Sequence, residues 1–237
     1  MAPLRGAALL SFGAMTSFLT ETLDKSYSAL VVRGCRVMIE YKAKRDNEIR
    51  ADLVDWLMFT HQGTPDVRIY HEFKVRSRSA RADLVLLNGE MAGYEIKSDA
   101  DTVARLHKQV HAFSSVMDKV SIVVTDKNIA KAKYIVPDWC GVIHYAGDDD
   151  EKFRVVEEPK PCPERDAREV ATLLSAAELY QALKRRGFAR GLAKAPLREM
   201  IEAFVNFLNA SEQRADILAA LKARVDFSEE MKAKYGR

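Results

Sequence analysis

The chain has 237 residues, of which 48% are hydrophobic and 30% are charged. This length allows one domain with a sizeable core and an appendage, and the composition is that of an ordinary globular protein. The formal net charge of +3 is too small to identify a nucleic-acid partner, so the positions of the basic residues are more informative than their total.

The cysteines and the apolar runs exclude two classes of protein. Cys35, Cys140 and Cys162 are far apart and in no CxxC arrangement, which argues against a disulfide framework or a zinc cluster and fits a reducing compartment. No run approaches the roughly 18 apolar residues of a spanning helix. Residues 1–20 lack a charged start and a sustained apolar core, so they are interpreted as a first helix or a loose arm. We expect a cytoplasmic protein without a membrane partner.

The type of the first element is ambiguous, and the next two elements are a clear helix and a clear strand. Residues 29–41, "ALVVRGCRVMIEY", could form strand or helix. In residues 45–60 the apolar side chains recur at helical spacing, with Asp46 or Asn47 as the cap, and "HQGTPD" ends the helix. Residues 67–75 alternate like a strand and lead into the basic loop "RSRSAR".

The central elements predict the fold class. Two strands are predicted over residues 82–87 and 93–97, an amphipathic helix over 99–117, and further strands over 119–126 and 140–146. The order of one helix, three strands, a helix and two strands predicts an α/β fold. Its mixed sheet would have four to five strands flanked by helices.

Changes in composition predict the domain boundaries. Residues 148–168 are polar and contain three of the seven prolines, so they are interpreted as a linker. Three helical patterns without strands follow. We therefore predict an N-terminal extension over residues 1–40, a core over 41–147, the linker, and a helical appendage over 169–237.

Three charged residues lie among apolar ones in the predicted hairpin. Glu95 and Lys97 are two apart on a strand and therefore point to the same face. Asp83 lies on the preceding strand and can be a direct neighbour of Glu95. Since adjacent carboxylates repel, a divalent cation is the usual compensation, and a lysine beside it can orient a water or stabilise phosphate charge.

The hairpin loop decides whether these side chains converge. Opposed residues of an antiparallel pair have position numbers with a constant sum, and Asp83 opposes Glu95 only if the loop has an odd length or a bulge intervenes. A two-residue Asn88-Gly89 turn would send the two carboxylates to opposite faces. We predict a loop of three or five residues, such as Asn88-Gly89-Glu90, or a bulge.

The spacing D-(x11)-E-x-K on a hairpin followed by a helix resembles the active-site motif of the PD-(D/E)XK nuclease superfamily. Its setting, "RADLVLLNGEMAGYEIKSDADTVARLHKQVHAFSSVMDKVSIVVTD", resembles a little-characterised bacterial and phage family within that superfamily, from about Asn47 to the C-terminus. Ala82 stands where the superfamily's name has proline, a position that varies among such nucleases. The resemblance implies a restriction-endonuclease-like core and a magnesium-dependent phosphodiesterase site, with Mn²⁺ as a substitute.

In that resemblance Asp83 and Glu95 would bind the metal and Lys97 would act beside the attacking water. Glu48 matches a glutamate that many members place on the first core helix as a further ligand, although an acidic residue in a first turn also suits the helix dipole. Gln109 matches part of a Gln-x-x-x-Tyr helix motif, with Phe113 in place of the tyrosine. The alternative is a buried glutamine that bonds only backbone.

Other polar residues have simpler interpretations. Glu72 is interpreted as an ion-pair partner of Arg76 or Arg81. His107 and His111 have the i, i+4 spacing of a zinc site but lack the glutamate of a metalloprotease helix, so they are interpreted as surface histidines.

Two basic clusters are candidate phosphate contacts, with solvated faces as the alternative. They comprise Arg76, Arg78 and Arg81 beside Asp83, and Lys184, Arg185, Arg186 and Arg190, with Lys194, in the appendage. The function expected is a metal-dependent nuclease, with DNA favoured over RNA and a homodimer allowed. The rival hypothesis is a catalytically silent nuclease-fold module that binds nucleic acid or protein in phage–host conflict.

Overall fold

The computed structural model describes residues 21–24, 27–32, 35–40, 45–75, 80–147 and 151–224. The chain divides into two compact units, Met1–Ala43 and Lys44–Arg237. The first contains an antiparallel sheet of β1 (Glu21–Asp24), β2 (Tyr27–Val32) and β3 (Cys35–Glu40). Of the two alternatives for residues 29–41, the strand is therefore correct.

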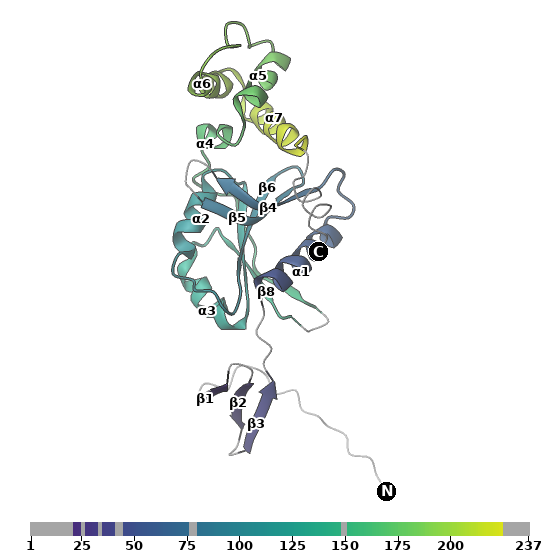
Figure 1. Cartoon of the computed structure of the whole chain (residues 1–237), viewed down its shortest axis with the longest axis vertical. Coiled ribbons are helices and arrows are strands. Elements are labelled where there is room, and N and C mark those ends of the chain that lie inside the picture. Colours follow the sequence, from purple (N-terminus) through teal and green to yellow (C-terminus); the bar gives the residue numbers. More distant parts are fainter. Residues whose placement is uncertain are drawn as a thin grey trace. The chain divides into compact units, whose positions relative to one another are not determined.

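The second unit is built on a six-stranded mixed sheet in the order β4-β5-β6-β7-β8-β9 (Figure 1). Strands β4, β5 and β6 are antiparallel, β6, β7 and β8 are parallel, and β9 runs antiparallel to β8. The strand bounds are Arg68–Val75, Ala80–Leu87, Met91–Lys97, Lys119–Val124, Gly141–Tyr145 and Phe153–Glu157. The predicted α/β class is confirmed, although the sheet has six strands where four to five were expected.

Helices cover both faces of this sheet. Helix α1 (Asp46–Thr60) buries Ile49, Leu53 and Leu57 against one face, in a cluster with even-numbered residues of β5 and β6. Helices α2 (Leu106–Ser114) and α3 (Asp126–Ile135) pack on the other face, α2 against β5 and β7 and α3 against β7 and β8 (Figure 1). Because each fully buried leucine contributes about 1.5–3 kcal/mol, these contacts fix the register of the central strands.

The segment between β6 and α2 differs from the predicted helix over residues 99–117. Helix α2 begins only at Leu106, and the two preceding aspartates bond to other groups. Asp101 Oδ2 accepts from the Ser98 N–H at 2.9 Å, and Asp99 Oδ1 accepts from Thr125 Oγ1 at 2.7 Å. These bonds hold the chain in a turn directly after β6, because a carboxylate that bonds elsewhere no longer caps a helix.

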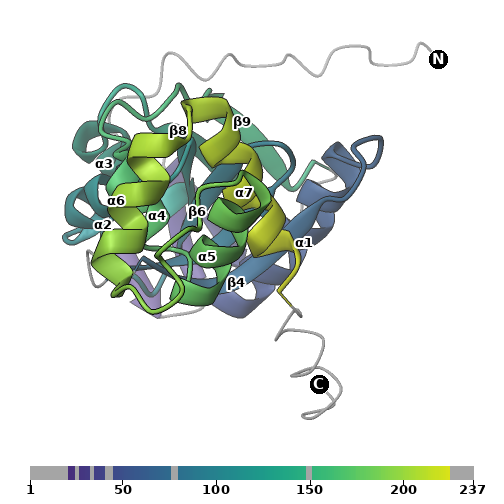
Figure 2. The ribbon, with the colours of Figure 1, turned by 90° about the horizontal axis from the view of Figure 1, so that it is seen from above.

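The C-terminal part contains four helices where three patterns were predicted. They are α4 (Ala167–Ala171), α5 (Ala176–Arg185), α6 (Leu197–Phe207) and α7 (Ala210–Lys222), which gather together in Figure 2. Their buried side chains belong to the same apolar cluster as α2 and its sheet face. Strand β9 lies within the segment predicted as a linker. It pairs with β8 at the edge of the sheet and buries Phe153, while most of its other residues are exposed.

Among the described residues, no helix combines the length and the apolar character needed to cross a membrane. Strand β7 is buried along almost its whole length, as its continuous apolar sequence predicts for a central parallel strand.

Candidate functional site

The hairpin of β5 and β6 has the three-residue loop that the parity argument requires. Leu87 pairs with Met91 and Leu84 pairs with Tyr94, so Asn88-Gly89-Glu90 forms the loop. Gly89 has φ +111°, a backbone conformation that favours glycine. One step beyond the last pair, this register sets Asp83 opposite Glu95. The prediction of an odd loop is confirmed, and the two carboxylates share the sheet face that α2 covers.

At Asp83 the pairing of β5 is interrupted on both sides, toward β4 and toward β6. The β4–β5 ladder pairs His71 with Leu84 and Phe73 with Ala82, and it skips Glu72 and Asp83 between them. Glu72 has φ +54°, which is unusual for a residue other than glycine and costs about 1–3 kcal/mol. Such strain is common at functional sites, and here it lies on the strand next to the carboxylate cluster.

The groups that the open ladder leaves at Asp83 are bonded by side chains. Arg50 on α1 donates to the Asp83 carbonyl and to its Oδ1, both at 2.8 Å, and it also forms ion pairs with Glu72 and Asp46. The Asp83 Oδ2 accepts from the Ile96 N–H at 2.8 Å. Both carboxylate oxygens of Asp83 therefore have protein partners.

Glu95 is nearly buried and only half satisfied. Its Oε1 accepts from Lys97 Nζ at 2.6 Å and from Gln109 Nε2 at 2.5 Å, while its Oε2 has no hydrogen-bond partner. Burial, followed by the charge of Asp83, raises the pKa of Glu95 to about 7 against the opposing effect of Lys97 and Gln109. This carboxyl can therefore change its charge near neutral pH.

Gln109 contacts Glu95 instead of backbone, so the alternative of a glutamine that bonds only backbone is wrong. Its own Oε1 is buried without a hydrogen-bond partner. Two unpartnered oxygens, Glu95 Oε2 and Gln109 Oε1, thus belong to side chains already joined by a hydrogen bond. Buried polar atoms seldom stay unpaired in proteins, so a water molecule or an ion is the expected partner of these two oxygens.

These side chains line a pocket of about 430 Å³ on the α2 side of the sheet. Its wall carries Asp83, Glu95 and Gln109 together with three cations, Arg81, Arg105 and Lys108. Arg81 also forms an ion pair with Glu72, which confirms the partner interpreted for that glutamate. A cavity with an acidic floor and a basic rim can attract an anionic ligand and hold a cation beneath it.

A hard divalent cation fits these donors. The unpartnered Glu95 and Gln109 oxygens and the Asp83 carboxylate form an oxygen-only set, which Mg²⁺ prefers, and Mg²⁺ commonly uses one or two carboxylates plus water and substrate phosphates. Within the described part of the chain, no three His, Cys, Asp or Glu residues group closely enough to hold a metal by themselves. A bound ion would also share Asp83 with Arg50.

The other predicted site residues are less closely involved. Glu48 lies exposed on α1, and the pocket wall formed by described residues does not include it. Asp46 lies one turn before Arg50 on the same helix. It is linked to Asp83 through Arg50, which forms an ion pair with both carboxylates. Arg76 and Arg78 lie outside the described residues. The rings of His107 and His111 are 4.4 Å apart, and His111 Nδ1 contacts Glu164 Oε1.

The basic cluster of the C-terminal helices divides into two groups. Arg185 and Arg186 both contact the buried Asp216 on α7, at 3.1 and 3.0 Å, so they tie α5 to α7. Lys184 and Arg190 are exposed, and neither has an ion pair with any described residue. Lys184 and Arg190 are therefore the better candidates for phosphate contacts.

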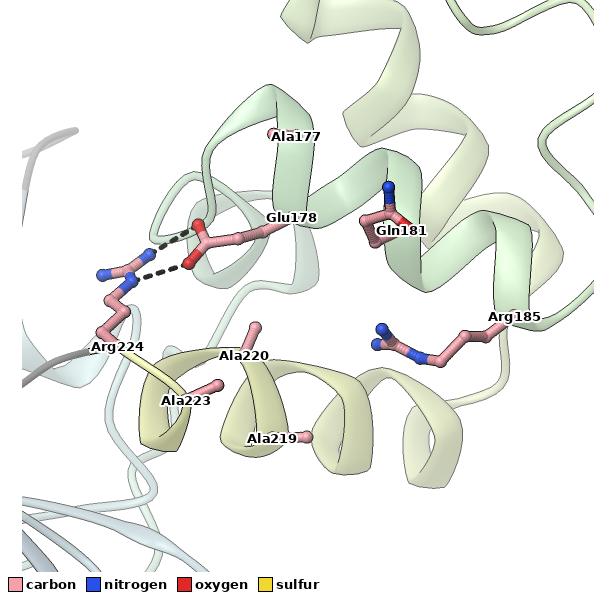
Figure 3. A pocket seen from close by; sticks show the side chains of 8 residues that line it. All are labelled: Ala177, Glu178, Gln181, Arg185, Ala219, Ala220, Ala223 and Arg224. Carbon is pink, nitrogen blue, oxygen red and sulfur yellow. Dashed lines mark hydrogen bonds and ion pairs between the residues drawn. The ribbon is translucent and has the colours of Figure 1, made fainter.

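A second pocket of about 430 Å³ lies between α5 and α7 (Figure 3). Half of its lining residues are alanines. The carboxylate in its wall, Glu178, is bonded by Arg224 at 2.8 and 2.9 Å and by the Ser175 N–H at 2.7 Å. Burial favours a higher pKa for Glu178, but the bonds from Arg224 and Ser175 outweigh it and lower the pKa to about 2. Both oxygens of this glutamate therefore already accept hydrogen bonds from the protein.

Sequence reasoning missed three site residues. Arg50 follows Asp46 by one helical turn, a spacing that predicts only their mutual ion pair and not the reach to Asp83. Arg105 lies four residues before Gln109, and Lys108 precedes Gln109 directly. The helical spacing of Arg105 and Gln109 was the signal that could have found this basic rim.

Comparisons with known proteins identify the family. The profile described as Bacteriophage P4 protein cII matches residues 40–234, which include the sheet and the C-terminal helices. Protein cII of Enterobacteria phage P4 is 26% identical to the chain over 181 residues, covering 76% of this chain and 67% of the phage protein. No solved structure matches significantly. Because the profile spans most of the chain, the protein belongs to the Bacteriophage P4 protein cII family.

Proposed function

We propose that this chain is a metal-dependent nuclease of the PD-(D/E)XK type that hydrolyses phosphodiester bonds, with DNA favoured over RNA. The observation that carries the proposal is the convergence of Asp83, Glu95 and Lys97 on one sheet face, with one Glu95 oxygen left unpartnered. The cofactor proposed is Mg²⁺, with Mn²⁺ as a substitute. When bound, the ion would polarise the phosphodiester and lower the pKa of a water ligand.

Asp83 and Glu95 would hold the cation, and Gln109 would fix Glu95 through its hydrogen bond of 2.5 Å. Lys97 keeps its ammonium 2.6 Å from Glu95 Oε1. From there it can orient an attacking water or balance the charge that develops on the phosphate in the transition state. The turn of Ser98 and Asp99, bonded to α3 and its N-terminus, limits the movement of Lys97 at the end of β6.

The basic rim of the pocket would bind the substrate backbone. Arg105 and Lys108 line the pocket and have no ion pair with any described residue, and Arg81 adds a third positive charge. Phosphate contacts of this kind position a nucleic acid without reading its sequence. Their distribution beside two carboxylates suits a phosphodiester better than a neutral ligand.

The test is incubation of the protein with single-stranded, duplex and branched DNA and with RNA, with and without Mg²⁺. We expect Mg²⁺-dependent cleavage of at least one DNA substrate, and its loss with EDTA and in Glu95→Gln. The matched control is Glu90→Gln on the same hairpin, where Glu90 pairs with Lys119 away from the pocket, and it should cleave like the parent. Metal-independent cleavage, or full activity of Glu95→Gln, would sink the proposal.

The alternative is a silent nuclease-fold module that binds nucleic acid or protein. The engagement of both Asp83 oxygens, by Arg50 and by the Ile96 N–H, favours it, because a metal must compete with a guanidinium. The two functions differ in one measurement. Binding without cleavage in Mg²⁺ and in Mn²⁺, for the parent and for Arg50→Gln alike, would support the module.

A further inference from the structure

A pair of exposed aromatic rings lies on the C-terminal helices, and neither ring belongs to the residues that line the candidate pocket. Phe188 follows α5 and Phe207 ends α6, and their rings stack with centroids 5.2 Å apart and an interplanar angle of 20°. Phe188 is 42% exposed and Phe207 is 53% exposed. Apolar rings that pack a core are normally buried, so this pair presents aromatic surface to solvent.

The position of Phe188 is fixed by the end of α5. The Phe188 N–H donates to the Leu183 carbonyl at 2.8 Å, and the Gly187 N–H donates to the Lys184 carbonyl at 3.1 Å. These two bonds form a Schellman motif, and Gly187 adopts the φ of +83° that the motif requires. The backbone of Phe188 is therefore held in place, and its ring stacks on Phe207 while a large part of it stays exposed.

The chain around this ring is strongly basic. From Lys184 to Arg198 it carries six basic side chains and no acidic one. Arg185 and Arg186 are bound to Asp216, whereas Lys184, Arg190 and Lys194 are exposed without an ion pair to any described residue. Arg190 is two residues from Phe188, so their Cα atoms lie within about 7 Å.

We propose that Phe188 and Phe207, with Lys184 and Arg190 beside them, form a platform for single-stranded nucleic acid. Exposed rings stack on bases of any sequence, and free cations contact the phosphates between them, which is the usual combination in single-strand binding. A duplex hides its base faces and gains only the charge contacts. The inference shares the nucleic-acid partner of the proposed function but does not depend on cleavage.

The experiment measures binding of fluorescent oligo-dT and of a duplex of equal length by anisotropy, in EDTA. We expect Phe188→Ala and Phe207→Ala each to weaken oligo-dT binding by about fivefold or more, as the loss of one stacking ring does elsewhere, and to change duplex binding much less. The slope of affinity against salt should stay unchanged in these variants. In Lys184→Ala and Arg190→Ala it should fall by about 0.7 each.

Two controls make the result specific. Tyr134→Ala removes a ring that is 92% exposed on α3, and it should bind both ligands like the parent. Phe188→Leu and Phe207→Leu keep an apolar side chain but lose the ring, so they test stacking if an alanine variant unfolds in a thermal melt. These leucine variants should show the same selective loss for oligo-dT.

Equal losses for oligo-dT and duplex, or no loss for either, would overturn the platform. Self-association of the parent that the ring variants abolish, with DNA binding intact, would instead identify an interface between copies and also overturn it. A protein that cleaves nothing but shows ring-dependent oligo-dT binding would refute the proposed nuclease and leave this inference standing.

Discussion

Two glutamates of this protein line pockets of equal volume, and their pKa values are shifted in opposite directions. Glu178, between α5 and α7, has both oxygens bonded by Arg224 or Ser175, and its pKa falls to about 2. Glu95, beneath α2, has one oxygen without a partner beside a second carboxylate, and its pKa rises to about 7. The two pockets do not differ in volume, but they differ in whether both oxygens of the glutamate accept hydrogen bonds.

The difference separates a structural carboxylate from one suited to a ligand. A carboxylate with a complete set of donors contributes to stability, and a cation must compete with those donors for its oxygens. A half-satisfied, buried carboxylate beside a like charge is destabilising by itself, and a cation or a proton relieves it. This is why the candidate chemistry is assigned to Glu95 and not to Glu178.

The largest expected effect is on cleavage. Lys97→Met keeps the length of the side chain but removes the ammonium, so the rate should fall by about a hundredfold or more, while nucleic-acid binding stays within about twofold. Lys119→Met is the matched control, because the Lys119 ammonium pairs with Glu90 outside the pocket. Near-normal cleavage by Lys97→Met would contradict the assignment of the chemistry to the pocket around Glu95.

The next effect is the pH dependence of stability in the absence of divalent ions. Because the pKa of Glu95 rises from 4.5 to about 7 on folding, its favourable contribution is complete below pH 4.5 and is lost as the pH rises through about 7. Urea unfolding should detect a loss of up to about 3 kcal/mol between these pH values. Glu95→Gln should remove that loss. An equal slope in parent and variant would show that Glu95 titrates normally.

Glu178 should behave in the opposite way. Since its folded pKa is about 2, its stabilising contribution is present above pH 4.5 and is lost as the pH falls through 2. Glu178→Gln should lower the free energy of unfolding at neutral pH by about 1–2 kcal/mol, because it weakens the Arg224 pair and the helix cap. Chemical denaturation at neutral and at acid pH checks both statements. An unchanged free energy of unfolding in Glu178→Gln at neutral pH would contradict them.

The smallest effect concerns phosphate contacts. Arg105→Ala and Lys108→Ala should each reduce the slope of log affinity against log salt by about one for duplex DNA, without changing the stability of the fold. Arg185→Ala is the contrasting variant. Its guanidinium is bound to Asp216, so it should lower the thermal midpoint and leave the salt slope unchanged. A reduced salt slope in Arg185→Ala, with an unchanged slope in Arg105→Ala and Lys108→Ala, would mean that Arg185 contacts phosphate and the pocket residues do not.

Much of the fold was predictable because its strands obey simple periodicity. The alternation in β4, the apolar run of β7 and the helical spacing of α1 all correspond to the structure. Strand β9 was not predicted, because its short apolar stretch lies between polar and proline-containing segments that indicate a linker. The start of α2 was missed because Asp99 and Asp101 bond across the turn instead of capping the helix.

The candidate site was predictable where spacing along one hairpin defines it. Asp83, Glu95 and Lys97 converge because strand parity and an odd loop force them together, and Gln109 was named from a helix motif of the superfamily that the sequence resembles. Arg50 was not predictable, because its contact with Asp83 joins residues 33 positions apart. The left-handed backbone of Glu72 was equally hidden, since glutamate carries no preference for that conformation.

The bond between the Ile96 N–H and Asp83 Oδ2 makes one backbone amide sensitive to the charge of the site. In a regular ladder that amide would meet a backbone carbonyl. Here its proton chemical shift and its exchange with solvent should change when the Asp83 carboxylate binds a cation or exchanges one partner for another. Ile96 thus offers a spectroscopic reporter at the centre of the sheet, which registers ligand entry even in a variant that performs no reaction.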